Sequence, residues 1–189
     1  MLRVLRRLLL LLCVAAIAGG ALLTFTSRPK LETAHRDVVR EWSHTRTRLT
    51  PRYALLDEIE AALRNSGREL TITDSIAAAH SKWAASTASA ESAGSASASA
   101  SVARQIEAAN AIEGILRRAQ LITDQSPRLS NNAALTKALG RVARILGDPA
   151  QIDTLNRSID RANELRNGLL RRLVAGGLGY EDLPHFAGF

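Results

Sequence analysis

The side chains able to act as metal ligands or general bases are spread thinly along this sequence. The four histidines are far apart, and no two are spaced as His-x-x-x-His: they are His35, His44, His80 and His185. A zinc site on one helix brings two ligands together at that spacing. We therefore predict no metal site.

Motifs of nucleophilic and phosphate chemistry are also missing from the sequence. It contains no Gly-x-Ser-x-Gly turn and no glycine-rich phosphate loop. Its single cysteine, Cys13, cannot form a disulfide within one chain. Most carboxylates are found among arginines, which is typical of surface ion pairs. We expect a protein that has no catalytic residues, uses no cofactor and is not an enzyme.

The composition predicts helices as the elements of the fold. Hydrophobic residues make up 46% of the chain, but aromatic residues only 4%. Alanine is abundant and buries little area, so the core must be thin and built from Leu, Ile and Val on helix faces. A sandwich or barrel would need more β-branched and aromatic residues. The expected class is all-α.

An uncharged stretch near the start of the sequence predicts a membrane-spanning helix. Residues 8–25 read LLLLLCVAAIAGGALLTF and follow three arginines. As a helix they would be about 27 Å long, close to the ~30 Å hydrocarbon core of a bilayer. We expect a single-pass protein of the cell membrane, with the bilayer as partner. The span would include Leu8, Leu12, Ile17, Leu22 and Phe25.

The same stretch also has features of a secretory signal peptide. A cut near Ala18 or Ala21 would release a secreted or periplasmic ligand-binding helical domain. We favour an uncleaved anchor because the apolar run continues through Leu22 and Phe25. Basic residues flank both ends of the run, so the side of the membrane that holds the soluble domain is left open.

The net charge of +7 has two readings. The arginines are scattered along the chain rather than clustered in one segment. Attraction to anionic lipid headgroups is therefore favoured over nucleic-acid binding, and we expect no nucleic-acid partner. The sequence does not predict an oligomeric state.

Apolar residues spaced by three and four predict amphipathic helices between residues 31 and 175. We expect a break at Pro51 with Thr50 as cap, and a second helix starting at Asp74. Residues 85–101 are rich in Ser and Ala, which favours a flexible connection. After a turn with a cap at Asn131 or Asn132, the last helix breaks again at Asp148, with Pro149 as its first residue. A Gly-rich, aromatic tail follows, whose apolar residues must pack on the bundle or on the membrane.

These segments predict three parts. Residues 1–27 form the basic N-terminus and anchor, residues 28–175 an antiparallel, roughly four-helix bundle, and residues 176–189 the tail. We expect Arg52 to lay its stem along the apolar seam with its head in water, and Glu113 to face away from the core. The residues predicted to pack the bundle are Trp42, Leu49, Leu56, Leu116, Leu139, Ile152 and Ile159.

Four stretches, in this order, resemble the LemA family of bacterial membrane-anchored proteins. They are the apolar anchor, EWSHTRTRLTPRYALLDEI, SPRLSNN with its Pro-x-Leu-x-x-Asn turn, and the run from GDPAQIDTLNRSIDRANELRN into LLRRLVAGGLGYEDLPHF. The chain is identified as a divergent member, with Asp57 where the family usually has Pro. The resemblance implies an antiparallel helical bundle at the membrane. It implies no reaction, so we expect a docking or scaffolding module for envelope proteins that bind the bundle surface.

Overall fold

In a computed structural model, the chain is described for residues 2–66, 70–88, 95–145, 148–167, 172, 175–177 and 179–188. Side chains are described from residue 28 onward within these ranges, apart from residues 70 and 95–97. Every regular element in this part of the chain is a helix. The all-α class predicted from composition is confirmed.

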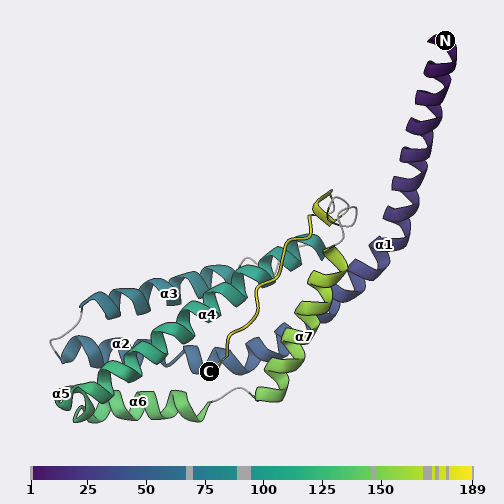
Figure 1. Ribbon diagram of the computed structural model, residues 1–189. Helices are drawn as coiled ribbons and strands as arrows, with labels where there is room; N and C mark the ends of the chain where they lie inside the picture. Colours follow the sequence, from purple (N-terminus) through teal and green to yellow (C-terminus); the bar gives the residue numbers. More distant parts are fainter. Residues whose placement is uncertain are drawn as a thin grey trace.

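The two halves of the first helix lie in different surroundings. Helix α1 (Leu2–Tyr53) is continuous, and its first half projects away from the other helices while its second half packs among them (Figure 1). The boundary that we predicted after residue 27, between anchor and bundle, does not interrupt this helix, which continues through Pro29. Pro29 removes only one backbone donor, and the Arg28–Glu32 ion pair and the Thr33 hydroxyl bond to the Pro29 carbonyl support the turn that follows it.

Together with α1, the other helices form two kinked arms and a hairpin. The first arm is α1 followed by α2 (Leu56–Asn65), and the hairpin is α3 (Leu70–Ala88) and α4 (Ser95–Gln125). After the single turn α5 (Pro127–Ser130), α6 (Ala133–Arg144) and α7 (Pro149–Arg166) form the second arm. Helix α6 lies against α2 and α7 against α1 (Figure 1), while α3 contacts both α2 and α4. The arms therefore run antiparallel.

Two predicted helix starts are confirmed. The Asn132 side chain accepts hydrogen bonds from the backbone N–H groups of Ala134 and Leu135 at the start of α6. At the start of α7, the Asp148 carboxylate accepts from the Ala150 N–H at 3.0 Å, and Pro149 takes the first position. Both caps satisfy donors that the first helical turn leaves without a partner.

Two other predicted helix boundaries are displaced along the chain. The kink predicted at Pro51 is present, but α1 continues through Pro51 and the chain turns three residues later; Thr50 is not its cap, since its hydroxyl bonds back to the Arg46 carbonyl. Helix α3 already begins at Leu70, so Asp74 lies inside it. Burial explains this early start, because Ile72 and Ile76 share one helix face and both pack in the core.

The Ser/Ala-rich connection is more ordered than predicted. Residues 85–88 belong to α3 and residues 95–101 to α4, while residues 89–94 lie outside the described residues. The prediction of a flexible segment is wrong for those helical parts. Small side chains allow α3 and α4 to approach closely. The buried Ser99 hydroxyl bonds to His35 of α1, and the buried Ser101 hydroxyl accepts from Gln105 within α4.

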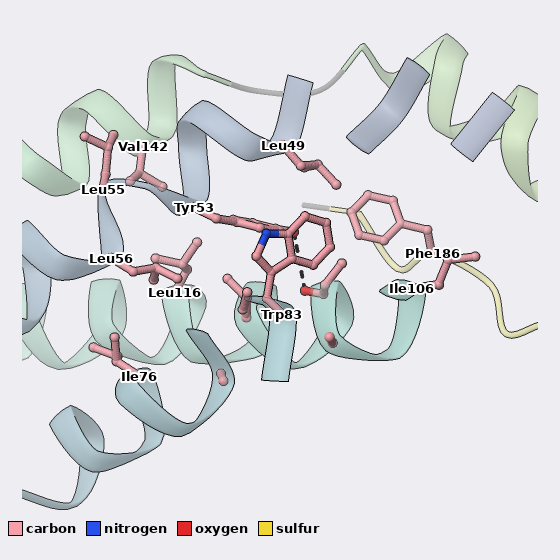
Figure 2. Packing of buried hydrophobic residues seen from close by; sticks show 14 of the residues in the cluster. Leu49, Tyr53, Leu55, Leu56, Ile76, Trp83, Ile106, Leu116, Val142 and Phe186 are labelled. Carbon is pink, nitrogen blue, oxygen red and sulfur yellow. Dashed lines mark hydrogen bonds between the residues drawn. The ribbon is translucent and has the colours of Figure 1, made fainter. Parts of the chain in front are cut away.

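A cluster of aromatic rings forms the centre of the core. Trp83 of α3 packs edge-on against Trp42 and Tyr53 of α1, with ring centroids 6.3 and 5.0 Å apart. Phe186 of the tail reaches the other side of Trp42 at 5.9 Å. Figure 2 shows Tyr53, Trp83 and Phe186 among aliphatic residues of the same core, such as Leu49 and Leu116. A few large rings thus supply the volume that alanine cannot, at contact angles favourable for aromatic pairs.

No helix in the part of the chain that the structure describes is both long and apolar enough to cross a membrane. The side chains of residues 1–27, which include all five residues of the predicted span, lie outside that part.

Candidate functional site

The most buried ion pair lies where the first arm kinks. The Arg52 guanidinium donates to both oxygens of Glu113 in α4, at 3.2 Å from Nε and 2.9 Å from Nη2. Its Nη1 donates to the carbonyls of Val142 and Ile145 at the end of α6, at 2.5 and 3.3 Å. Arg52 therefore connects three helices and satisfies carbonyls that the end of α6 leaves unpaired.

This pair corrects two sequence predictions. The side chains of Arg52 and Glu113 are only 5% and 1% exposed, so the guanidinium is not in water and Glu113 does not face outward. Their separation of 61 residues explains the error, since spacing within one helix does not reveal a partner on another. Burial raises the pKa of Glu113, and Arg52 opposes that rise.

A second buried cluster centres on Gln105 of α4. Its side-chain oxygen accepts from the Trp42 indole N–H at 2.7 Å. Its amide nitrogen donates to the Ser101 hydroxyl at 3.2 Å and to the Ser86 carbonyl at 3.3 Å. Gln105 thereby joins α1, α3 and α4, and its hydrogen-bonding groups are all used in the fold.

A third cluster lies near the point where α1 enters the bundle. The His35 Nδ1 is 2.8 Å from the Ser99 hydroxyl, and the Tyr180 ring stacks on the imidazole at a centroid distance of 4.3 Å. Burial, together with the nearby Arg166 charge, lowers the pKa of His35 to about 4. Such a neutral, covered imidazole supports packing, because Tyr180 closes the approach to the Ser99–His35 pair.

The tail crosses the bundle as an extended segment held by three asparagines. Residues 179–188 run from the α1–α7 end of the molecule toward its centre (Figure 1). Each asparagine makes two hydrogen bonds to the tail backbone, one as donor and one as acceptor. Asn163 pairs with both groups of Leu183 at 2.9 and 3.0 Å, and Asn156 with both groups of Phe186 at 3.0 Å. Asn110 of α4 pairs with the His185 carbonyl and the Ala187 N–H at 2.8 Å.

Apolar side chains of the tail fill the space between the helices. Tyr180, Leu183 and Phe186 are all less than 5% exposed. An ion pair between Arg166 and Asp182 and a bond between His185 and Asp160 lie at the edges. Of the two places that the sequence allowed for the tail, the bundle is therefore the one it occupies.

Comparison with known proteins gives no further lead, since no family model, no curated protein and no solved structure matches the chain. The LemA resemblance therefore remains a prediction.

The residues predicted to pack the bundle lie as follows. Trp42, Leu49, Leu56, Leu116, Leu139 and Ile159 are buried, and Ile152 is half-buried against the same core. Arg52, Glu113, Gln105 and the three tail-binding asparagines were not among the predicted site residues. An asparagine pair seven residues apart on one helix was the only available signal for the tail contacts.

Helix α1 carries two Glu-x-x-His spacings, Glu32–His35 and Glu41–His44, and this spacing supplies ligands in di-iron bundles. Glu32 pairs with Arg28, while His35 is buried on Ser99 and Tyr180. Among the described residues, no three His, Cys, Asp or Glu side chains lie close enough together to hold a metal ion.

Proposed function

We propose that this chain is a LemA-like, single-pass membrane protein whose helical bundle is a non-catalytic docking or scaffolding module for envelope proteins. The observation that carries the proposal is the continuity of α1. One helix contains the uncharged stretch of residues 8–25 and also supplies Trp42, Leu49 and Tyr53 to the core.

A continuous helix suits a rigid connection between a bilayer and a soluble domain. The first half of α1 projects away from the bundle (Figure 1), so the bundle does not cover it. An uncharged run of that length is most stable in hydrocarbon, where helices satisfy their own backbone groups. Anchoring there would hold the bundle at a fixed distance from the membrane surface.

The use of the buried polar groups supports a non-catalytic role. Arg52 and Glu113 neutralise each other, and Gln105 satisfies Trp42. A catalytic group has to reach a substrate, whereas these groups face neighbouring helices. Each of them instead fixes the position of one helix against another, which is the property a docking surface requires.

Membrane fractionation of the full chain tests the anchor. We expect the protein to stay in the membrane pellet at high salt and to enter solution only with detergent. Replacing Leu12 and Ile17 together by arginine should move it to the soluble fraction, because each charge at mid-bilayer is costly. Leu121→Arg is the matched control, since Leu121 is an exposed apolar residue of the bundle. Release of the unmodified chain by salt alone would refute the proposal.

N-terminal sequencing of the purified protein separates the two readings of the apolar stretch. An intact N-terminus agrees with the anchor. A new terminus near residue 19 or 22 would instead establish the released, ligand-binding alternative. A reporter fused after Phe189 would then locate the bundle on one side of the membrane.

A further inference from the structure

The tail lies along Asn110 of α4 and Asn156 and Asn163 of α7, a surface called the groove below, which has the chemistry of a peptide-binding site. Asn156 and Asn163 are seven residues apart on α7, which is two helical turns or about 10.5 Å. Their partners Phe186 and Leu183 are three residues apart on an extended chain, which spans about 10 Å. The two repeats match, so each asparagine meets the backbone of one tail residue, with the tail running antiparallel to α7.

Recognition in this groove is divided between backbone and side chains. The asparagine side chains bond to backbone N–H and C=O groups of the tail. Every extended segment offers these groups, unless a proline stands where an N–H must donate. Selectivity comes from three buried positions with the same spacing of three, namely Tyr180, Leu183 and Phe186. The groove thus selects an aromatic, an aliphatic and an aromatic residue in that order, and the Arg166–Asp182 pair adds an acidic residue directly before the second.

We propose that this groove binds the C-terminal segment of a second copy of the chain, so that two molecules exchange residues 179–189. The contacts between the tail and the groove in one molecule already define the partner's chemistry, and exchange would need no new surface. Gly176 and Gly177 come shortly before the tail, and Gly179, its first residue, has a positive φ of 76°. Glycine allows the chain to enter the tail in more than one direction.

This inference goes beyond the proposed function and stands on different observations. It rests on the asparagine contacts and on the buried tail residues, not on the anchor. Anchoring in a membrane would favour exchange by concentrating the copies. A chain that proves soluble could still exchange tails, so the two proposals can fail separately.

Photo-crosslinking between full-length chains tests the exchange. One population, the donor, carries a benzoylphenylalanine in place of Glu181, which is exposed next to the buried Tyr180. It is mixed in detergent with an acceptor population of different size tag and irradiated. We expect a covalent donor–acceptor dimer, which an excess of the free peptide GYEDLPHFAGF suppresses at least tenfold.

The proposal predicts that Phe186→Ala has opposite effects on dimer yield in the donor and in the acceptor. Phe186→Ala in the donor removes the anchor from the incoming tail and should lower dimer yield at least fivefold. Phe186→Ala in the acceptor weakens its own tail and should raise the yield severalfold. Adding Asn156→Ala and Asn163→Ala to that acceptor should abolish the gain, whereas Asn65→Ala, at an exposed site outside the groove, should leave it unchanged.

Other outcomes overturn the proposal. Only intramolecular crosslinks, with a fluorescent peptide that also fails to bind, would make the tail a fixed part of each fold. Peptide binding without donor–acceptor dimers would assign the groove to a segment of another protein. A shuffled peptide that suppresses dimers equally well would show unspecific adhesion. If Phe186→Ala prevents folding, the unmodified chains with and without competing peptide still decide the question.

Discussion

The Arg52 guanidinium and the Glu113 carboxylate form two parallel contacts inside the bundle, 61 residues apart along the chain. Both side chains are almost fully buried, so each charge is stabilised by the other. Removing one partner leaves the other charge buried without this opposite charge, which is the costly way to break such a pair. The fold around the kink of the first arm is therefore sensitive to either residue.

We expect Glu113→Gln to lower the free energy of unfolding by about 3–5 kcal/mol. Urea unfolding of the full chain in detergent, followed by circular dichroism, measures this loss. The double variant Arg52→Met, Glu113→Leu should lose less than the sum of its single variants, because no uncompensated charge remains. Arg141→Ala is the control: its pair with Glu58 is about half exposed, so the cost should stay within about 1 kcal/mol. Equal losses at both pairs would contradict the burial argument.

The second prediction concerns Gln105. Gln105→Leu keeps the volume of the side chain but leaves the Trp42 indole N–H buried without its acceptor. An unsatisfied buried donor costs about 1–3 kcal/mol, so the unfolding free energy should fall by that amount. Gln120→Leu removes a similar bond, to Asp124, at the surface and should have little effect. A neutral Gln105→Leu would mean that water replaces the lost acceptor.

The third prediction is a dependence of stability on pH. His35 is neutral in the fold because its pKa is lowered to about 4, while in the unfolded chain it titrates near 6.5. Between those values the unfolded state binds the extra proton, so stability must fall as pH decreases. From pH 7 to pH 5 this one group should remove about 2 kcal/mol.

His35→Gln isolates that contribution, because glutamine still offers a bond to Ser99 but does not titrate. The difference in unfolding free energy between pH 7 and pH 5 should shrink by about 2 kcal/mol relative to the unmodified chain. His44→Gln, at an exposed histidine, should leave the difference unchanged. Parallel pH profiles for all three proteins would show that the pKa of His35 is the same in the folded and the unfolded chain.

The sequence predicted those features of the fold that local rules determine. Helix starts at Asn132 and Asp148 follow from capping, since the acceptor and its donors are within three residues of each other. The residues predicted to pack the core followed from a spacing of three and four on single helices. The Ser/Ala-rich segment was predicted to be flexible because Ser and Ala bury little apolar area. That criterion does not reveal that small side chains let two helices, here α3 and α4, pack closely.

The candidate site was not predictable, because its contacts are long-range. Glu113 looked like a surface residue until α4 was placed against Arg52 on another helix. Asn156 and Asn163 looked like ordinary polar residues on an exposed helix face, and only the returning tail gives them partners. No rule of local periodicity connects α7 with a segment twenty to thirty residues further along.

The last prediction concerns how firmly the tail is held. Asn156→Ala and Asn163→Ala together remove four hydrogen bonds to the backbone of Phe186 and Leu183. The tail should then open more often, which exposes its aromatic residues to chymotrypsin. We expect cleavage after Tyr180 or Phe186 to speed up at least tenfold, while the helical signal of the bundle stays unchanged. Asn65→Ala should be cut at the original rate, and an unchanged rate in the double variant would show that apolar burial alone holds the tail.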